Sequence, residues 1–501
     1  MFTGNYDFTL CPLPGTATIE HVATRDRLTA LDTSFLHLEA GGAHMHVASI
    51  LTFSGEAPGY DELVDAIESR LHLVPRYRQR LAEVPYGQGR PVWVDDPHFN
   101  ARYHIRHTAL PTPGTDWELK ALAGRLFAQP LDRAKPLWEI WLVEGLDDDR
   151  FAVIGKTHHA LVDGVSGVDI TAILFDSSAD PSPVAPPDRA WTPRPTPTDA
   201  QLLADALLER ATVPAEAFRG LRALTRAPRE VAERLGRGLG GIRAFAAAGL
   251  DSAPPSPLNV EIGPHRRYTW VDADLTEFKA IKDGLGGTIN DVVLSAVNLA
   301  LGAFLRDRGH PTQDLVLKAL VPVSVRAEIE QGALGNRVAA MWAPLPVGIQ
   351  EPIDVFATVH EAMDGLKESG QAVGAQTLTE LIDFAPPTIL SQAARLQSRQ
   401  RFFNVVVTNV PGPQMELFLL GRPLVALYPV VPLAKRQALG IAIMSYNGRL
   451  GFGLLGDYDA MPDIEQLADR LREAIDDLAV AAGITPSRPR RSRRRSSAVT
   501  A

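Results

Sequence analysis

Two adjacent histidines, followed by an aspartate and a glycine, are the residues of this chain best suited to moving protons. They are His158, His159, Asp163 and Gly164, in the stretch FAVIGKTHHALVDGVSG. A histidine side chain titrates near neutral pH, so it can take a proton from a hydroxyl group and return it within one reaction cycle. The β-forming residues before His158 predict a strand, and a histidine placed just after a strand can project into a cleft. The pattern indicates His159 as a general base.

Asp163 and Gly164 predict a sharp turn after the histidines, because glycine tolerates backbone angles that other residues avoid. Asp163 is interpreted as an orienting group that pairs with an arginine or accepts backbone hydrogen bonds. The residues alone leave another reading open, in which His159 is a hydrogen-bonded core residue. A metal site is not expected, because no HExxH arrangement is present.

Length and composition bound the class of protein. A chain of 501 residues exceeds what one hydrophobic core usually supports, so two domains are expected. A net charge of -9 disfavours nucleic acid as a partner. Cys11 is the only cysteine, which excludes an intrachain disulfide and favours a cytoplasmic location. No signal peptide and no membrane-spanning run is evident, so any membrane contact is expected to be peripheral.

Proline-rich breaks divide the chain. Seven prolines fall between residues 181 and 197 and mark a linker, and three more follow at positions 254, 255 and 257. The stretch between them is expected to be helical, either a solvated connector or a basic face that lies on anionic lipid. The C-terminal end is arginine-rich and expected to be disordered. The predicted division is an N-terminal domain at 1–180, a linker at 181–262, a C-terminal domain at 263–485 and a tail at 486–501.

Strand-like and helical patterns alternate in both halves. Short β-forming runs occur at 47–53 and 151–156 in the first half, and at 268–271 and 315–321 in the second. Residues 440–455 predict a hairpin whose Asn447-Gly448 pair suits a tight turn. Two α/β sandwich domains of similar size are expected.

Longer blocks extend the histidine motif into a family resemblance. HHALVDG resembles the HHxxxDG signature of acyltransferases similar to chloramphenicol acetyltransferase and of peptide-synthetase condensation domains. Other blocks of the chain occur in the order typical of bacterial wax ester synthases/diacylglycerol acyltransferases. Two of them precede the histidine motif, RLTALDTSFLHLEAGGAHMHVASILTF and KPLWEIWLVEGL, and three come after it, TINDVVLSAV, VVTNVPGP and SYNGRLGFGLLGD. The resemblance to that family covers nearly the whole chain.

The resemblance implies a fold and an activity. The fold would be two chloramphenicol-acetyltransferase-like α/β sandwich domains joined by a helical linker, with the active site at their interface. Long-chain acyl-CoA would be the co-substrate, without a cofactor, and diacylglycerol or a long-chain fatty alcohol the acceptor. His159 would be the general base, while His158 would bond to the loop and fix its geometry. The enzyme would associate peripherally with membranes or lipid droplets.

Other residues fall in the family's blocks. Pro136 and Trp138 are expected to shape the core beside the histidines, and Thr288 is a good N-cap for a helix that Asp291 would stabilise from its first turn. The resemblance makes Asn290 the better candidate for reaching the active centre and binding substrate, with Asp291 as a second candidate. The remaining candidates for substrate binding are Thr408, Asn409 and Ser445.

Two other functions stay open at this stage. One is a related acyltransferase that uses a different hydroxyl compound, such as a polyketide alcohol or a carrier-bound acceptor. The other is a protein that binds acyl-CoA or lipid without turning it over.

Overall fold

The computed structural model describes residues 26–39, 42–161, 174–180, 184–209, 252–324, 338–368 and 402–486. The expectations for Asp163 and Gly164, for the helical stretch at 210–251 and for the arginine-rich tail from residue 487 fall outside the described residues.

The first sheet has six strands in the order β11-β12-β1-β6-β5-β4. Its central pair, β1 (His46–Ser54) and β6 (Arg150–His158), is antiparallel and in register along nine residues. Both strands are rich in β-branched and aromatic residues, which pack well on a pleated surface. The other strands are β4 (Ile105–Ala109), β5 (Trp138–Leu146), β11 (Phe418–Leu419) and β12 (Arg422–Val430).

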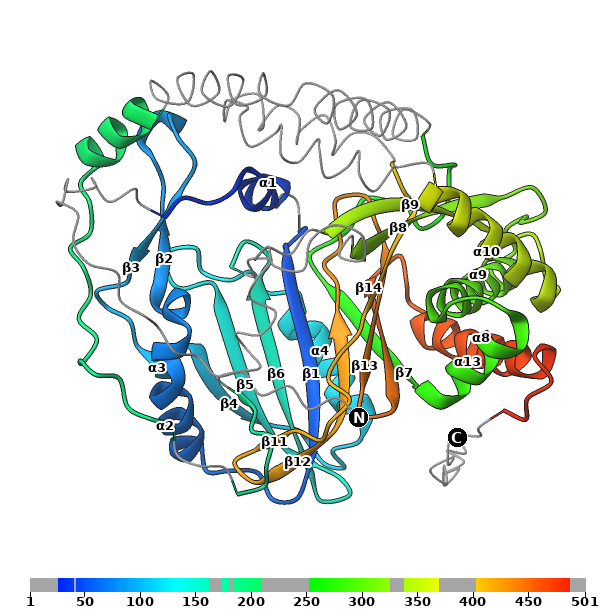
Figure 1. Cartoon of the computed structure of the whole chain (residues 1–501), viewed down its shortest axis with the longest axis horizontal. Helices are drawn as coiled ribbons and strands as arrows, with labels where there is room; N and C mark the ends of the chain where they lie inside the picture. The colour runs from blue at the N-terminus through cyan, green and yellow to red at the C-terminus, as the bar shows by residue number, and fades with distance from the viewer. Residues whose placement is uncertain are drawn as a thin grey trace, which may run out of the picture.

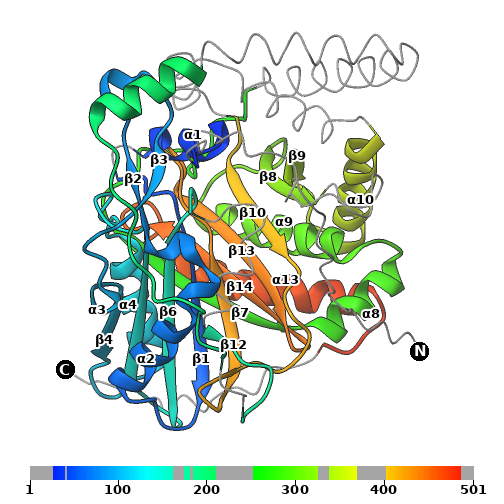
Figure 2. The same cartoon turned by 60° about the vertical axis from the view of Figure 1, so that its left-hand side comes forward.

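Helices cover both faces of the first sheet (Figures 1 and 2). The helices α2 (Tyr60–Arg70) and α3 (Ala101–His104) pack on one face, in a core that includes Phe53 and Phe151. Helix α4 (Asp116–Phe127) packs on the other face, between the first sheet and strand β7 of the second. Alternate residues of β6 therefore enter two different cores, and the strand is buried on both faces.

A smaller layer lies at the upper end of the first domain in Figure 1. It contains the helix α1 (Ala30–Leu38) and the hairpin of β2 (Gln79–Ala82) and β3 (Val92–Asp95). Two short 3₁₀ turns, Leu71–Leu73 and Pro75–Arg78, precede the hairpin, and a third, Pro85–Gly87, lies at its tip.

The second sheet has the order β7-β14-β13-β10-β8-β9 and carries its helices on the right in Figure 1. Its core is built around the helix α9, whose apolar residues are buried almost all round. The predicted hairpin at 440–455 is present, with Asn447 and Gly448 both at positive φ. The elements are β7 (Arg266–Asp274), α8 (Leu275–Leu285), α9 (Ile289–Asp307), β8 (Val316–Ser324), β9 (Val338–Pro346), α10 (Pro352–Glu368), β10 (Val405–Val410), β13 (Leu439–Tyr446), β14 (Arg449–Asp457) and α13 (Ile464–Ala481).

Among the described helices, α9 alone is long and apolar enough to cross a membrane. Most of this helix is buried inside the second domain. This burial is typical of the core helix of a globular domain.

The predicted two-domain α/β fold is confirmed, and two strands from the predicted C-terminal range 263–485 lie in the sheet of the first domain. Strands β11 and β12 belong to that range by sequence, yet they complete the first sheet, where β12 pairs with β1. The pairing covers an edge of β1 that would otherwise be open. On its way, β12 crosses β14 so closely that a Cβ on Gly451 or Gly453 would lie 2.1 or 1.8 Å from the carbonyl oxygens of Leu427 and Pro429.

The start of the linker lies along the first domain. Arg194 binds the buried carboxylate of Asp95, and Trp191 lies under the guanidinium of Arg78 at 4.6 Å. Residues 199–209 are helical. This part of the linker is therefore packed against the first domain.

Candidate active site

His159 lies just beyond the end of β6, where the strand leaves the first sheet. Its backbone N–H donates to the carbonyl of Met45 at 2.8 Å, which extends the β1–β6 ladder by one bond. The half-buried imidazole stacks on Phe35 of α1, with ring centroids 4.0 Å apart. Its Nδ1 atom is buried and has no hydrogen-bond partner among the described residues. Backbone and ring are thus held from two sides, by β1 and by α1.

The imidazole of His159 is neutral at pH 7. Burial, with a smaller contribution from the neighbouring His158, lowers its pKa from 6.5 to about 4. Burial has this effect because it disfavours the charged form of the ring. A neutral ring has a free lone pair, which a general base requires.

His158 is enclosed where His159 is not. Its backbone N–H donates to Leu137 at 2.9 Å, and its Nδ1 accepts the N–H of Ala160 at 3.0 Å. The Nδ1 atom is therefore an acceptor and the ring proton sits on Nε2, which lies 3.2 Å from Oε1 of Glu39. With both nitrogens facing protein groups, the ring is placed to fix the turn that carries His159.

Glu39 joins the elements around the histidines. Its Oε1 accepts the N–H of Met45 at 2.9 Å, and its Oε2 accepts Nε of Arg133 at 3.1 Å. Burial alone would raise the pKa of this carboxyl, but the interactions with His158, Arg133 and Met45 outweigh it and hold the pKa well below its ordinary value. Glu39 therefore stays ionised and connects α1, β1, β6 and the segment after α4.

Sequence reasoning did not assign a role to Glu39, although it quoted the block that contains it. The available signal was a single acidic residue following an amphipathic helix. Such a glutamate is ordinarily a surface residue. Its burial depends on Arg133, 94 positions away, and on His158.

His46 and Lys156 complete the polar layer beneath His159. His46 lies opposite His158 in the β1–β6 pair, and burial lowers its pKa well below 6.5, so it is neutral. The Nζ atom of Lys156 donates to the carbonyls of Leu126 and Gln129 at the end of α4, and burial lowers its pKa. These contacts tie β6 to α4.

Pro136 and Trp138 stand beside the histidines and shape the core. Trp138 is fully buried, donates from Nε1 to the carbonyl of Tyr77 at 2.8 Å and stacks on His104 with centroids 4.6 Å apart. Its own N–H bonds to the carbonyl of Pro136. The pair thereby positions Leu137, whose carbonyl anchors His158.

Asn290 and Asp291 begin α9 in the second domain. The carboxylate of Asp291 accepts the N–H of Thr288 at 2.9 Å, in the capping arrangement expected from the sequence. It also lies 2.9 Å from Nδ1 of His360 on α10. Within the described part of the chain, no hydrogen bond or ion pair joins Asn290 or Asp291 to His159.

The remaining candidates lie on strands β10 and β13. Thr408 and Asn409 are half-buried and pair with Ala442 and Ile443 in the second sheet. The hydroxyl oxygen of Ser445 accepts the N–H of Gly412 at 3.1 Å and Nε2 of Gln414 at 2.9 Å. Ser445 therefore holds the turn after β10, and the described contacts do not bring these three residues to His159.

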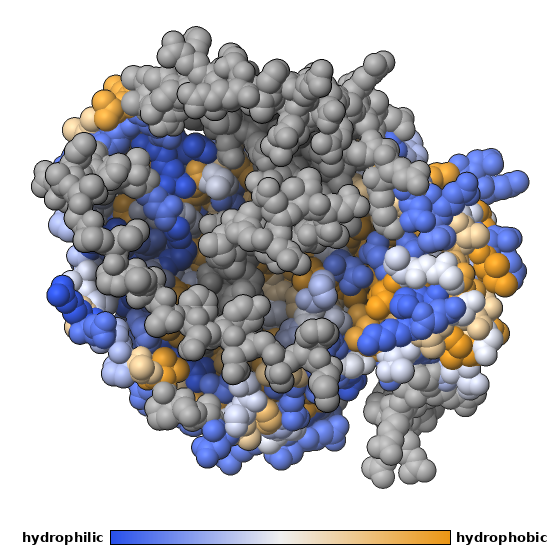
Figure 3. Space-filling model, in the orientation of Figure 1, coloured by the Kyte–Doolittle hydropathy of each residue, from blue (hydrophilic) through white to orange (hydrophobic). Residues whose placement is uncertain are grey.

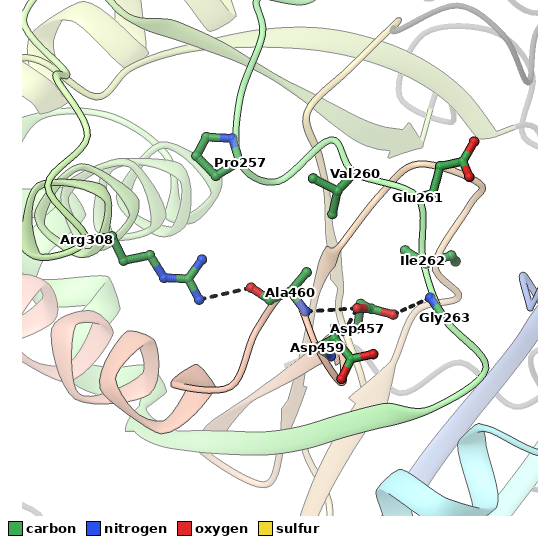
Figure 4. Close-up of a pocket in the computed structure, with 9 residues that line it drawn as sticks. All are labelled: Pro257, Val260, Glu261, Ile262, Gly263, Arg308, Asp457, Asp459 and Ala460. Carbon is green, nitrogen blue, oxygen red and sulfur yellow. Dashed lines mark hydrogen bonds between the residues drawn. The ribbon is translucent and has the colours of Figure 1, made fainter.

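A cavity of about 550 Å³ opens elsewhere, at the edge of the second domain. Figure 4 shows that its polar groups bond to one another: Asp457 accepts from Gly263 and Ala460, and Arg308 donates to the carbonyl of Ala460. None of its lining residues touches His159 in the described contacts. Among the described residues, no cluster of histidine, cysteine, aspartate or glutamate could hold a metal ion.

Comparison with known protein families identifies the family to which this site belongs. Residues 28–293 match the family model for the wax ester synthase/diacylglycerol acyltransferase catalytic domain, and residues 334–479 match the model for the C-terminal domain of the same family. The chain belongs to this family. It is an acyl-CoA-dependent acyltransferase, and the predicted enzyme class is confirmed.

Similar proteins cover nearly the full chain. A probable diacylglycerol O-acyltransferase of Mycobacterium tuberculosis is 33% identical over 458 residues, which is 90% of this chain and 95% of the relative. A putative diacylglycerol O-acyltransferase of the same organism is 33% identical over 471 residues, covering 91% and 90%.

Solved structures agree with the family and the fold. The wax ester synthase/diacylglycerol acyltransferase from Marinobacter aquaeolei VT8 is 29% identical, covers 91% of this chain and all of its own, and superposes with a TM-score of 0.64. The starter condensation domain of rhizomide synthetase, solved with C8-CoA and Leu-SNAC, is 13% identical, covers 93% and 96%, and has a TM-score of 0.55. The second likeness supports the fold alone.

Proposed function

We propose that this enzyme transfers a long-chain acyl group from CoA to the hydroxyl group of diacylglycerol, and that a long-chain fatty alcohol is a second acceptor. The names of the relatives support these acceptors. The observation that carries the chemistry is the neutral, half-buried imidazole of His159 at the end of β6.

The proposed reaction is a direct transfer. Since Nδ1 of His159 is buried, Nε2 takes the hydroxyl proton as the acceptor oxygen attacks the thioester carbon. The tetrahedral intermediate collapses, the carbon–sulfur bond breaks, and the proton passes from His159 to the departing CoA thiolate. General-base assistance of this kind typically contributes about 10²- to 10⁴-fold.

The surroundings of His159 fit this role. The stacking of Phe35 and the anchoring of the backbone to Met45 hold the ring in place, and Glu39 holds His158 next to it. A fixed base reacts faster than a mobile one, because its orientation costs no entropy in the transition state. Acyl-CoA acts as co-substrate, and the mechanism uses no cofactor and no acyl-enzyme.

A three-way assay tests the acceptor. Purified enzyme is given radiolabelled long-chain acyl-CoA with diacylglycerol, with hexadecanol or with no acceptor, and the lipid products are separated. We expect labelled triacylglycerol, a smaller yield of wax ester and only slow hydrolysis. Binding of acyl-CoA without CoA release under every condition would contradict a catalytic role, and turnover with neither lipid would indicate another hydroxyl acceptor.

We further propose that the enzyme works in the cytoplasm at the surface of a membrane or lipid droplet. Its proposed acceptors are insoluble lipids that must be taken from such a surface.

A further inference from the structure

Three large side chains are exposed at the outer end of the first domain. Tyr86 is 87% exposed, Leu207 is 52% exposed and Leu208 is 61% exposed. Tyr86 lies at the tip of the β2–β3 hairpin, and the two leucines lie on the helix at 199–209, drawn in green at the upper left of Figure 1. Hydrophobic atoms protrude at the same place in Figure 3.

The hairpin and the helix form one rigid unit. Leu202 packs against Val92 and Val94 of the hairpin. Ala206 also lies close to it, because a Cβ added to Gly89 would be only 3.0 Å from the Cβ of Ala206. Leu202 and Ala206 are four residues apart, so they lie on one face of the helix. Leu207 and Leu208 follow on another face and point away from the hairpin's core.

Tyr86 also has no role in packing that would explain its position. Its φ is 59°, a conformation uncommon for a bulky residue, within the Pro85–Gly87 turn. The fold thus holds an aromatic ring in solvent at the tip of a hairpin. Tyrosine has an apolar body and a polar tip, which suits the boundary between lipid and water.

The sequence that follows the helix favours an anionic partner. Residues 210–243 follow the helix directly and contain eight arginines and three glutamates, with no lysine or aspartate, which leaves an excess of five positive charges. Exposed apolar side chains that continue along the chain into a basic sequence are a combination typical of proteins that bind anionic lipid surfaces.

The exposed surface is connected to the active site through α1. At the base of the hairpin, the N–H of Leu28 donates to the carbonyl of Pro91 at 3.0 Å. Helix α1 begins two residues later, with Leu31 46% exposed on its surface, and Phe35, one turn further on, stacks on His159. A helix of nine residues is about 14 Å long, so α1 is a short link from the base of the hairpin to His159.

We propose that Tyr86, Leu207 and Leu208 form a docking surface for anionic lipid, from which the lipid acceptor reaches His159 along α1. This inference rests on the proposed function for its acceptor, but docking itself can be measured without turnover.

Vesicle binding provides the first test. The full-length protein and a Tyr86→Ser, Leu207→Gln, Leu208→Gln variant are sedimented with vesicles of phosphatidylcholine and phosphatidylglycerol, or of phosphatidylcholine alone. The wild type should bind the anionic vesicles, and the triple variant should bind them at least tenfold more weakly. The matched control carries Trp117→Ser and Val480→Gln, exposed apolar residues on α4 and α13, and should bind like the wild type.

Turnover provides the second test and separates the two proposals. With octanol as a dissolved acceptor, the triple variant should be as active as the wild type. With diacylglycerol in anionic vesicles, its activity should fall by about the same factor as its vesicle binding. Equal vesicle binding by the triple variant and the wild type would overturn the docking surface. A dimeric wild type and a monomeric triple variant would overturn it too, since the surface would then join two copies of the chain. Wild-type binding without any ester formation would instead count against the proposed function.

Discussion

The protonation states of two side chains define the site at the scale of residues. His159 is neutral because desolvation of its half-buried ring lowers its pKa, and Glu39 is ionised because His158, Arg133 and the N–H of Met45 stabilise its charge. His159 is therefore available as a base, and Glu39, which orients the neighbouring His158, keeps its negative charge. Each state has a measurable consequence.

The acidic limb of the pH profile reports on His159. Protonation inactivates a general base, so kcat/KM should fall only as the pH approaches about 4, the pKa that burial gives this ring. An unperturbed histidine would give a midpoint near 6.5. Initial rates between pH 4 and pH 8, with stability checked at each pH, measure the midpoint. A loss of activity centred near pH 6.5 would show that the ring is not desolvated as described.

The charge of Glu39 should make the free energy of unfolding depend on pH. Its folded pKa is lower than the ordinary 4.5, so its stabilising contribution is present above pH 4.5 and is lost as the pH falls towards the folded pKa. Glu39→Gln should lower the free energy of unfolding at pH 7, and its difference from the wild type should shrink below pH 4.5. Urea unfolding of both proteins across this range measures it, with Glu56→Gln as an exposed control. A constant difference would contradict the ionic role.

The importance of Glu39 could not be predicted from local sequence. The histidines were identified because their type and spacing are unusual by themselves. A glutamate after a helix has no such mark, and its burial follows from contacts with Arg133 and His158 far along the chain.

At the scale of elements, β6 and the start of α9 illustrate what local patterns can predict. The strand before His158 and the cap formed by Thr288 and Asp291 both follow from nearby residues, and both are present. The pairing of β12 with β1 joins residues more than 370 positions apart, such as Ala48 and Val430. Such a partner cannot be chosen from a strand pattern, because every strand of that kind offers the same backbone bonds.

Asp291 is expected to act on stability through α9. Asp291→Ala removes the acceptor for the N–H of Thr288 and the partner of His360, and should lower the free energy of unfolding by about 1–3 kcal/mol. The folded variant should keep its kcat, because its contacts lie between α9 and α10. Thermal unfolding and initial rates measure both quantities. Asn290→Ala is the neighbouring control, and its stability should stay close to that of the wild type.

An Asp291→Ala protein as stable as the wild type but inactive would reverse this reading. It would return the residue to the role in the active centre that the family resemblance left open.

At the scale of the whole molecule, two sheets are joined by an exchanged strand and a linker packed on the first domain. Strand β12 crosses β14 at Gly451 and Gly453 and then completes the sheet that carries His159. Two strands from the second half of the chain, β11 and β12, are thus part of the first domain's sheet. The family resemblance predicted both domains and their order, whereas the exchange became visible only in three dimensions.

The central claim is that His159 carries the proton, while His158 positions it. The most direct measurement is the rate of ester formation by purified His159→Ala and His158→Ala proteins, both shown by circular dichroism and thermal unfolding to be folded. His159→Ala should lose about 10²- to 10⁴-fold in kcat, and His158→Ala should lose less. Wild-type rates in folded His159→Ala protein, or a larger loss in His158→Ala, would contradict the account.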